Sequence, residues 1–117
     1  MSSKLAELSL EFSEKVIRVC DDIHKRAHIK NQILRSACSI GANIHEAQYA
    51  YSRNDFICKM QIALKECYET LYWLELLSRT ETIPPGCAQQ LINSCNRIRY
   101  MLITSINTAK SNTEKEG

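Results

Sequence analysis

Two glutamates, Glu66 and Glu69, are three residues apart and would share one face of a helix. Paired carboxylates can perform acid/base catalysis, but only in a pocket that holds a second polar group of matched pKa. The chain has no nucleophile motif, and none of its three histidines is spaced to assist the two glutamates. The sequence therefore predicts a protein that is not an enzyme.

Metal binding is the second chemistry to consider in a helical protein. Di-iron sites in four-helix bundles use Glu-x-x-His motifs, and the chain contains none. The nearest features are Asp21 with His24, and His24 with His28, near a predicted helix end where histidines are commonly solvated. His45 and Glu46 are adjacent, so they point about 100° apart on a helix and cannot chelate together. We expect no metal and no cofactor.

The six cysteines are not spaced as metal ligands. No two are separated by two residues, which excludes the paired Cys-x-x-Cys pattern of zinc sites. Most fall on apolar helical faces, so we interpret them as reduced, buried thiols that pack as small hydrophobic groups. They are Cys20, Cys38, Cys58, Cys67, Cys87 and Cys95.

A polar stripe is predicted on the second helix, where four polar residues follow one another at steps of four, four and three. Glu66 and Glu69 on the next helix could meet it. The stripe is either a network that fixes helix register or subunit docking, or a solvated face with an Arg to Glu pairing. Tyr72 and Trp73 diverge around their helix, so one should enter the core while the other faces outward as an interface anchor. The predicted interface or network residues are Arg35, Ser39, Asn43, Glu46, Glu66, Glu69, Tyr72 and Trp73.

The net charge of +2 neither establishes nor excludes a nucleic-acid partner. A solvated mixed-charge face explains any single basic residue, but a symmetric oligomer would repeat each modest patch and add the fields. Base stacking on Tyr68, Tyr72 and Trp73 lacks arginines interleaved nearby in the sequence. The predicted nucleic-acid-binding residues are Lys25, Arg26, Lys30, Arg53, Lys59, Arg97, Arg99 and Lys110.

The elements that position these residues are helices. The 117 residues contain only three Gly and two Pro, with 44% apolar residues, and apolar side chains recur at steps of three and four. This pattern predicts helices over residues 3–25, 30–50, 53–79 and 87–109. The residues predicted to face inward are Ile33, Ala37, Ile40, Ile44 and Ala47 in the second helix, Met60, Leu64, Cys67, Leu71 and Leu74 in the third, and Leu91, Cys95, Ile98, Leu102 and Ile106 in the fourth. Short connections favour an all-α, antiparallel up-down-up-down four-helix bundle over residues 1–110, followed by a polar C-terminal tail over residues 111–117 that is frayed or disordered.

Signals at the helix ends support this division. Ser52 followed by Asp55 is the pattern of an N-terminal cap, and Pro84 and Pro85 end the third helix. The N-terminus lacks the basic start and apolar core of a signal peptide, and no run approaches the roughly 20 apolar residues of a membrane span. We therefore expect a cytoplasmic protein with no membrane partner.

Small residues crowd the second helix between Ser36 and Ala42. Among them, Gly41 costs roughly 1 kcal/mol relative to Ala in a helix interior, so a packing reason is required. Close approach of another helix, from the same chain or from a second subunit, is the simplest reason.

Two stretches carry a family resemblance. They read RSACSIGANIHEA over residues 35–47 and NDFICKMQIALKECYETLYWLELL over residues 54–77. Their combination resembles the bacterial four helix bundle proteins, also called 23S ribosomal RNA intervening-sequence or S23-type proteins. The matching positions in the first stretch are Arg35, Ser36, Ser39, Ile40, Asn43, Ile44 and Glu46. Those in the second are Asp55, Phe56, Ile62, Ala63, Leu64, Lys65, Glu66, Glu69, Tyr72, Trp73, Leu74 and Leu76.

The resemblance implies a homo-oligomer, since family members look like five-fold rings of bundles. It also implies a link to nucleic acid, because distant relatives include accessory proteins of diversity-generating retroelements, which are basic barrels that bind nucleic acid and a reverse transcriptase. We therefore predict a non-enzymatic homo-oligomer, a pentamer by resemblance, that binds RNA or DNA as an assembly or accessory factor, with a nucleic-acid-processing protein as a further partner. The alternative is a protein-protein interaction scaffold with no nucleic-acid role.

Overall fold

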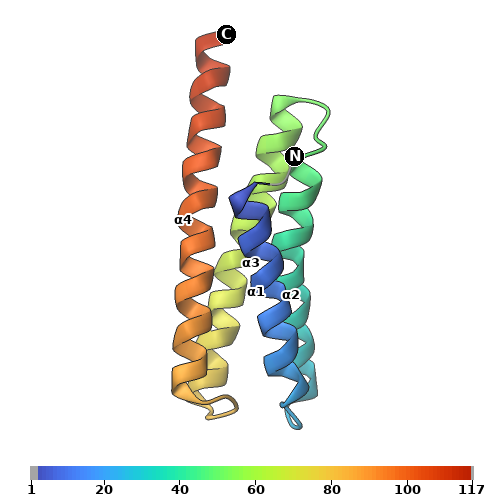
Figure 1. The fold of residues 1–117 in the computed structure, drawn as a ribbon, viewed down its shortest axis with the longest axis vertical. Helices are drawn as coiled ribbons and strands as arrows, with labels where there is room; N and C mark the ends of the chain where they lie inside the picture. Colours follow the sequence, from blue (N-terminus) through green and yellow to red (C-terminus); the bar gives the residue numbers. More distant parts are fainter. Residues whose placement is uncertain (1–2, 117) are drawn as a thin grey trace.

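The computed structural model describes residues 3–116, which form four α-helices connected by short loops. The helices are α1 (Lys4–Asp21), α2 (Ala27–Ala47), α3 (Arg53–Arg79) and α4 (Pro85–Glu116). Each runs opposite to the one before it, with the first and third connections at one end of the molecule and the second at the other (Figure 1). Each helix contacts its two neighbours in the cyclic order α1, α2, α3, α4. The fold is thus the predicted all-α bundle, 51 Å long and about 20 Å across.

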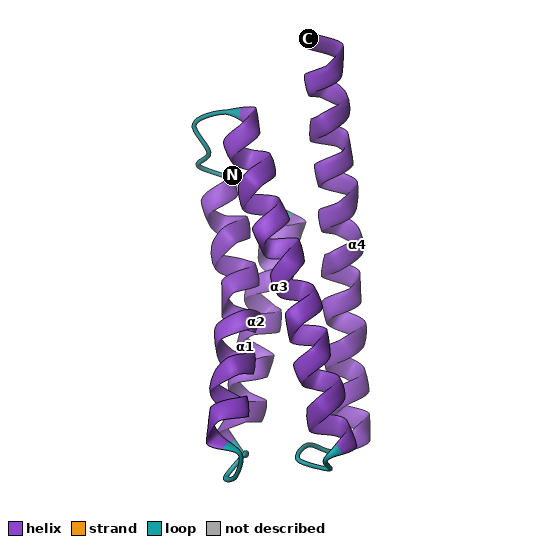
Figure 2. Ribbon diagram, turned by 180° about the vertical axis from the view of Figure 1, so that it is seen from behind, coloured by secondary structure: helices purple, strands orange, loops and turns teal. Residues whose placement is uncertain are grey.

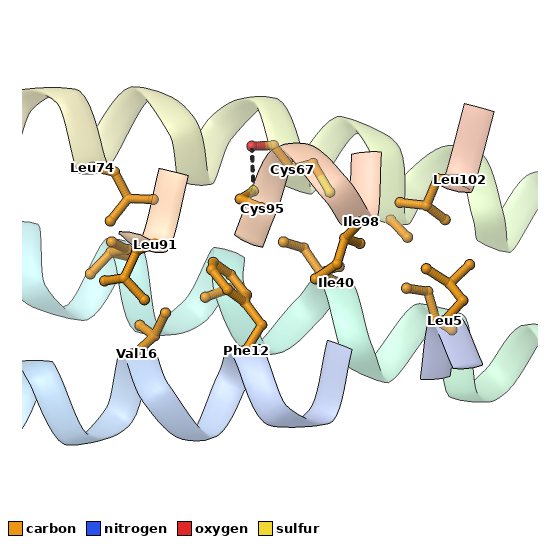
Figure 3. Packing of buried hydrophobic residues seen from close by; sticks show 14 of the residues in the cluster. Leu5, Phe12, Val16, Ile40, Cys67, Leu74, Leu91, Cys95, Ile98 and Leu102 are labelled. Carbon is orange, nitrogen blue, oxygen red and sulfur yellow. Dashed lines mark hydrogen bonds between the residues drawn. The ribbon is translucent and has the colours of Figure 1, made fainter. Parts of the chain in front are cut away.

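The core lies along the axis of the bundle, where all four helices contribute apolar side chains (Figure 3). The five residues predicted to face inward from α2 are all buried, as are the five predicted from α4. In α3 the buried stripe is rotated slightly from the predicted one. Ala63 and Thr70 are buried, whereas the predicted Leu64 and Leu71 are only partly buried. This rotation turns one flank of α3 toward α2.

The starts of α1 and α3 are capped by serine side chains. Ser3 Oγ accepts a hydrogen bond of 3.0 Å from the backbone N–H of Ala6, and Ser52 Oγ accepts one of 3.0 Å from that of Asp55. The Asp55 carboxylate in turn accepts from the backbone N–H of Tyr51 at 3.4 Å. The cap predicted from Ser52 and Asp55 is therefore present and fixes the short α2–α3 turn.

The first corner differs from the prediction because Arg26 adopts a left-handed backbone with φ of 57°. A left-handed residue cannot continue a right-handed helix, so α2 begins directly after Arg26, at Ala27 rather than residue 30. The first helix ends at Asp21 rather than residue 25. The side chain of Arg26 donates to Thr82 Oγ1 at 3.1 Å and joins the two loops at this end. Lys30 Nζ donates to the carbonyl of Ile23 at 3.2 Å.

The last helix is longer than predicted at both ends. It begins at Pro85, whose fixed φ and missing N–H suit the first turn of a helix, and it continues to Glu116. The predicted helix end at residue 109 was therefore wrong, because residues 110–116 continue the helix. Fraying of this polar tail stays a prediction, and residue 117 lies outside the described residues. Figure 2 shows the C-terminal turns of α4 projecting beyond the other three helices. None of the helices in the described part of the chain combines the length and the hydropathy of a membrane span.

Candidate functional site

The seam between α2 and α3 carries charged side chains that meet across it. Arg35 Nη1 donates to Glu66 Oε2 at 2.8 Å, and Arg35 Nη2 donates to Glu69 Oε2. Glu66 is buried, whereas half of the Arg35 side chain is exposed. The structure thus brings together three of the residues predicted for a polar network.

Trp73 completes this cluster. Its indole Nε1 donates to Glu69 Oε2 at 3.0 Å, and this hydrogen bond, followed by that of Arg35, lowers the pKa of Glu69 below its ordinary value of 4.5. The same pairing, chiefly with Glu69, raises the pKa of Arg35. A carboxylate held ionised by a permanent cation is a poor proton donor. Both glutamates accept hydrogen bonds from Arg35, so they link α3 to α2.

The remaining polar residues of the predicted stripe form separate local pairs. Asn43 Nδ2 donates to the carbonyl and to the hydroxyl of Ser39, at 2.9 and 3.1 Å, within α2. Glu46 Oε1 lies 3.7 Å from Lys59 Nζ of α3. The stripe is therefore a row of short-range pairs along one seam, and a role in subunit docking stays a prediction.

A buried hydroxyl pair lies beside the charged cluster and was missed from the sequence. Thr70 Oγ1 of α3 donates to Ser36 Oγ of α2 at 2.8 Å, and Ser36 Oγ donates to the carbonyl of Ile33 at 3.4 Å. Both side chains are fully buried. Thr70 is three residues after Cys67 and four before Leu74, so its place on the apolar face of α3 was the available signal.

The predicted nucleic-acid-binding residues are spread over the bundle. Lys25, Arg26 and Lys30 lie at the end that carries the first and third loops (Figure 1). Arg53 and Lys110 lie toward the opposite end. Lys59 lies at the contact between α2 and α3. The two arginines of α4 lie on opposite flanks of that helix. Arg97 lines a depression with Lys15 of α1, and Arg99 faces α3. Arg26, Lys30 and Lys59 already bind other parts of the chain.

The flank of α4 that faces α3 joins a cation to aromatic rings. Arg99 Cζ lies 4.5 Å from the ring centroid of Tyr100 and 5.6 Å from that of Tyr68 on α3. Tyr100 is 62% exposed and Tyr68 is 51% exposed. No arginine is interleaved with these aromatic residues in the sequence of α3, but Arg99 of α4 supplies one across the helix contact.

Tyr72 and Trp73, which are adjacent on α3, point in different directions, as expected. Trp73 packs against the core and Tyr72 is 62% exposed. Their rings meet edge to face, with centroids 5.0 Å apart. Tyr72 is one helical turn from Tyr68 and therefore shares its face of α3.

The small residues of α2 are explained first by packing within the chain. A Cβ at Gly41 would lie 3.4 Å from Ser9 Oγ and 3.5 Å from Ser13 Oγ of α1, so α1 is the helix that approaches closely. Outside this contact, α1 and α2 form a mostly apolar groove of about 550 Å³. Leu10 and Tyr49, which line it, are 66% and 73% exposed.

The cysteines differ in exposure. All six are free thiols; Cys20, Cys67 and Cys95 are buried, and Cys58 is exposed. Burial raises the pKa of the Cys20 thiol to about 11. The neighbouring Cys95 thiol, and then burial, raise that of Cys67. Among the described residues, no three His, Cys, Asp or Glu side chains are grouped so that they could hold a metal ion.

Comparisons with known proteins place this fold in a family. The model described as 23S rRNA-intervening sequence protein matches residues 2–104. A solved structure from Bacteroides thetaiotaomicron VPI-5482, a protein of unknown function from the S23 ribosomal protein family, is 44% identical to this chain. The similarity covers 87% of this chain and 97% of that one, with a TM-score of 0.82. A comparison with curated proteins finds no match. The chain therefore belongs to the 23S rRNA-intervening sequence protein family.

Proposed function

We propose that this protein is a non-enzymatic, self-associating helical bundle that binds RNA or DNA in the cytoplasm, as an assembly or accessory factor. The observation that carries this proposal is the chemistry of α4. From Pro85 to Asn112 the helix contains no aspartate or glutamate, yet it holds Arg97, Arg99 and Lys110. Its exposed positions are otherwise occupied largely by amides and hydroxyls.

A surface free of carboxylates suits a polyanion, because acids beside a phosphate contact would oppose it. Affinity for nucleic acid arises mainly from Lys and Arg that neutralise phosphates, and amide side chains hydrogen-bond to phosphates and bases. By contrast, α1 exposes Glu7, Glu11 and Glu14.

Self-association strengthens the proposal, because three cations on one copy give only a weak field. A ring of copies, five by resemblance to the family, would repeat the α4 surface and add the fields. The apolar α1–α2 groove supports association, since exposed apolar side chains such as Leu10 commonly mark protein contacts. Light scattering should give a mass that is a multiple of the chain mass, and Leu10→Lys should reduce it.

A fluorescence anisotropy titration with labelled RNA tests the binding. The variant Arg97→Gln/Lys110→Gln should weaken binding at low salt. The control variant Arg18→Gln/Arg79→Gln removes the same charge from two arginines that form exposed i, i+4 pairs with Glu14 and Glu75, and it should bind nearly as the parent does. Failure of the parent to bind RNA or DNA at low salt contradicts the proposal.

The apolar groove also favours a second candidate function, that of a protein-interaction scaffold with no nucleic-acid role. In that case the protein would self-associate through the groove. The parent and both double variants would all fail to bind nucleic acid. The same titration and mass measurement therefore separate the two functions.

A further inference from the structure

The Arg99 guanidinium is held before any ligand arrives. Its Nε donates to Asn96 Oδ1 at 3.1 Å, while its central carbon, Cζ, lies near the rings of Tyr100 and Tyr68. Arginine is always charged in proteins, and the side chain of Tyr68 raises the pKa of Arg99 further. An arginine fixed between two rings loses little further conformational freedom when it binds something else.

Both tyrosines keep more than half of their surface open although Arg99 lies against them. Arginine covers only part of each ring, so an aromatic surface remains that water solvates poorly. The amide of Asn96 is hydrogen-bonded to the Arg99 side chain and so lies at the same cluster. The cluster therefore offers a flat apolar surface, a hydrogen-bonding amide and a positive charge side by side.

These three features match one ligand, an unpaired nucleotide. Its base stacks on a ring, its edge takes an amide hydrogen bond, and its phosphate approaches the charge. In a duplex the faces of the bases are stacked on one another, so a tyrosine on a convex helix surface cannot reach them. Only an unpaired strand can use the ring surfaces.

We propose that Tyr68, Arg99 and Tyr100 form a stacking site for unpaired bases of single-stranded nucleic acid. This inference rests on the proposed function and specifies its ligand, because the stacking site borders the carboxylate-free surface of α4. Tyr72, on the same face of α3, extends the row of rings so that consecutive bases can be bound.

The test compares one labelled strand, chosen to lack self-complementarity, with the duplex formed from it and its complement, as RNA and as DNA. We expect the parent to bind the single strand more tightly. Because stacking is worth about 1–3 kcal/mol per base, Tyr100→Leu should weaken single-strand binding at least about fivefold and leave duplex binding unchanged. Tyr100→Phe retains the ring and should retain the affinity.

Tyr51→Leu provides a matched control, because Tyr51 is 90% exposed at the α2–α3 turn, away from the cluster. It should bind both ligands as the parent does. If the parent binds strand and duplex equally and Tyr100→Leu changes neither, the stacking site is wrong although the proposed function stands. If Tyr100→Leu lowers the light-scattering mass, the ring serves a subunit contact and the inference is overturned. Absence of all binding contradicts the proposed function itself.

Discussion

Arg35 of α2 donates a hydrogen bond of 2.8 Å to the carboxylate of Glu66 in α3, across the seam between the two helices. Glu66 is 8% exposed, whereas half of the Arg35 side chain is in contact with solvent. The pair therefore joins a buried carboxylate to a half-exposed guanidinium. Its contribution to stability depends on the cost of leaving the buried Glu66 carboxylate without its partner.

Replacing Arg35 by Met should destabilise the bundle. The Glu66 carboxylate would remain buried without its cation, at a cost of about 1–2 kcal/mol after allowance for the partly exposed partner. Urea unfolding followed by circular dichroism measures this cost. The control Arg18→Met breaks only the exposed pair with Glu14 and should cost about 0.5 kcal/mol or less. Equal losses in the two variants would show that Glu66 does not depend on Arg35.

The Trp73 hydrogen bond should make stability depend on acidity. Because it lowers the pKa of Glu69 in the folded state below 4.5, the stabilisation is present above that pH and is lost as pH falls through the lowered pKa. The variant Trp73→Phe removes this hydrogen bond. The difference in unfolding free energy between parent and Trp73→Phe should therefore be larger at about pH 6 than at about pH 3. A difference independent of pH would mean that Trp73 acts through packing alone.

The fold was predictable because apolar periodicity alone marks the buried face of a helix. In α2 the residues Ile33, Ala37, Ile40, Ile44 and Ala47 were identified from spacing, and all are buried. The corner near Arg26 was not predictable, since its left-handed backbone occurs at a residue that shows no preference for it. The end of α4 was also missed. The polar residues after Ala109 were not assigned to the helix because they lack apolar periodicity, although Lys and Glu favour helix.

The candidate site was predictable only where it lies between helices joined by a short turn. Arg35 could be paired with Glu66 because the tight turn between α2 and α3 fixes their register. The contact of Arg99 with Tyr68 could not, because it depends on the relative height and rotation of α3 and α4. The connection that contains Pro84 and Pro85 does not specify this height and rotation. The contact between Arg99 of α4 and Tyr68 of α3 is therefore seen only in the structure.

Gly41 gives a test of helix packing against α1. A Cβ at this position would make ordinary contacts with Ser9 and Ser13, so Gly41→Ala should fit and raise stability by up to about 1 kcal/mol through helix propensity. Gly41→Leu would force α1 outward and cost about 1–3 kcal/mol. A Cβ at Gly86 meets nothing within 4 Å, so Gly86→Leu should be tolerated. Tolerance of Gly41→Leu would contradict the close approach of α1.

The thiols should react in an order set by exposure. At neutral pH an aromatic disulfide reagent should modify Cys58 first, and Cys58→Ser should remove this fast phase. Cys20, Cys67 and Cys95 should react only when the protein unfolds, because they are buried and because Cys20 and Cys67 have raised pKa values. If Cys67 or Cys95 reacted as fast as Cys58 in the folded protein, the core would be wrongly described.

The dependence of RNA affinity on salt tests the role of α4 most directly. For a single strand, each phosphate contact contributes about 0.7 to the steepness of log K against log salt concentration. The variant Arg97→Gln/Lys110→Gln should therefore bind with a slope that is shallower than that of the parent by at least about 1.4, while Arg18→Gln/Arg79→Gln keeps the parental slope. A slope that the α4 variant leaves unchanged, or a parent that binds no RNA at low salt, would contradict the assignment of this surface to nucleic acid.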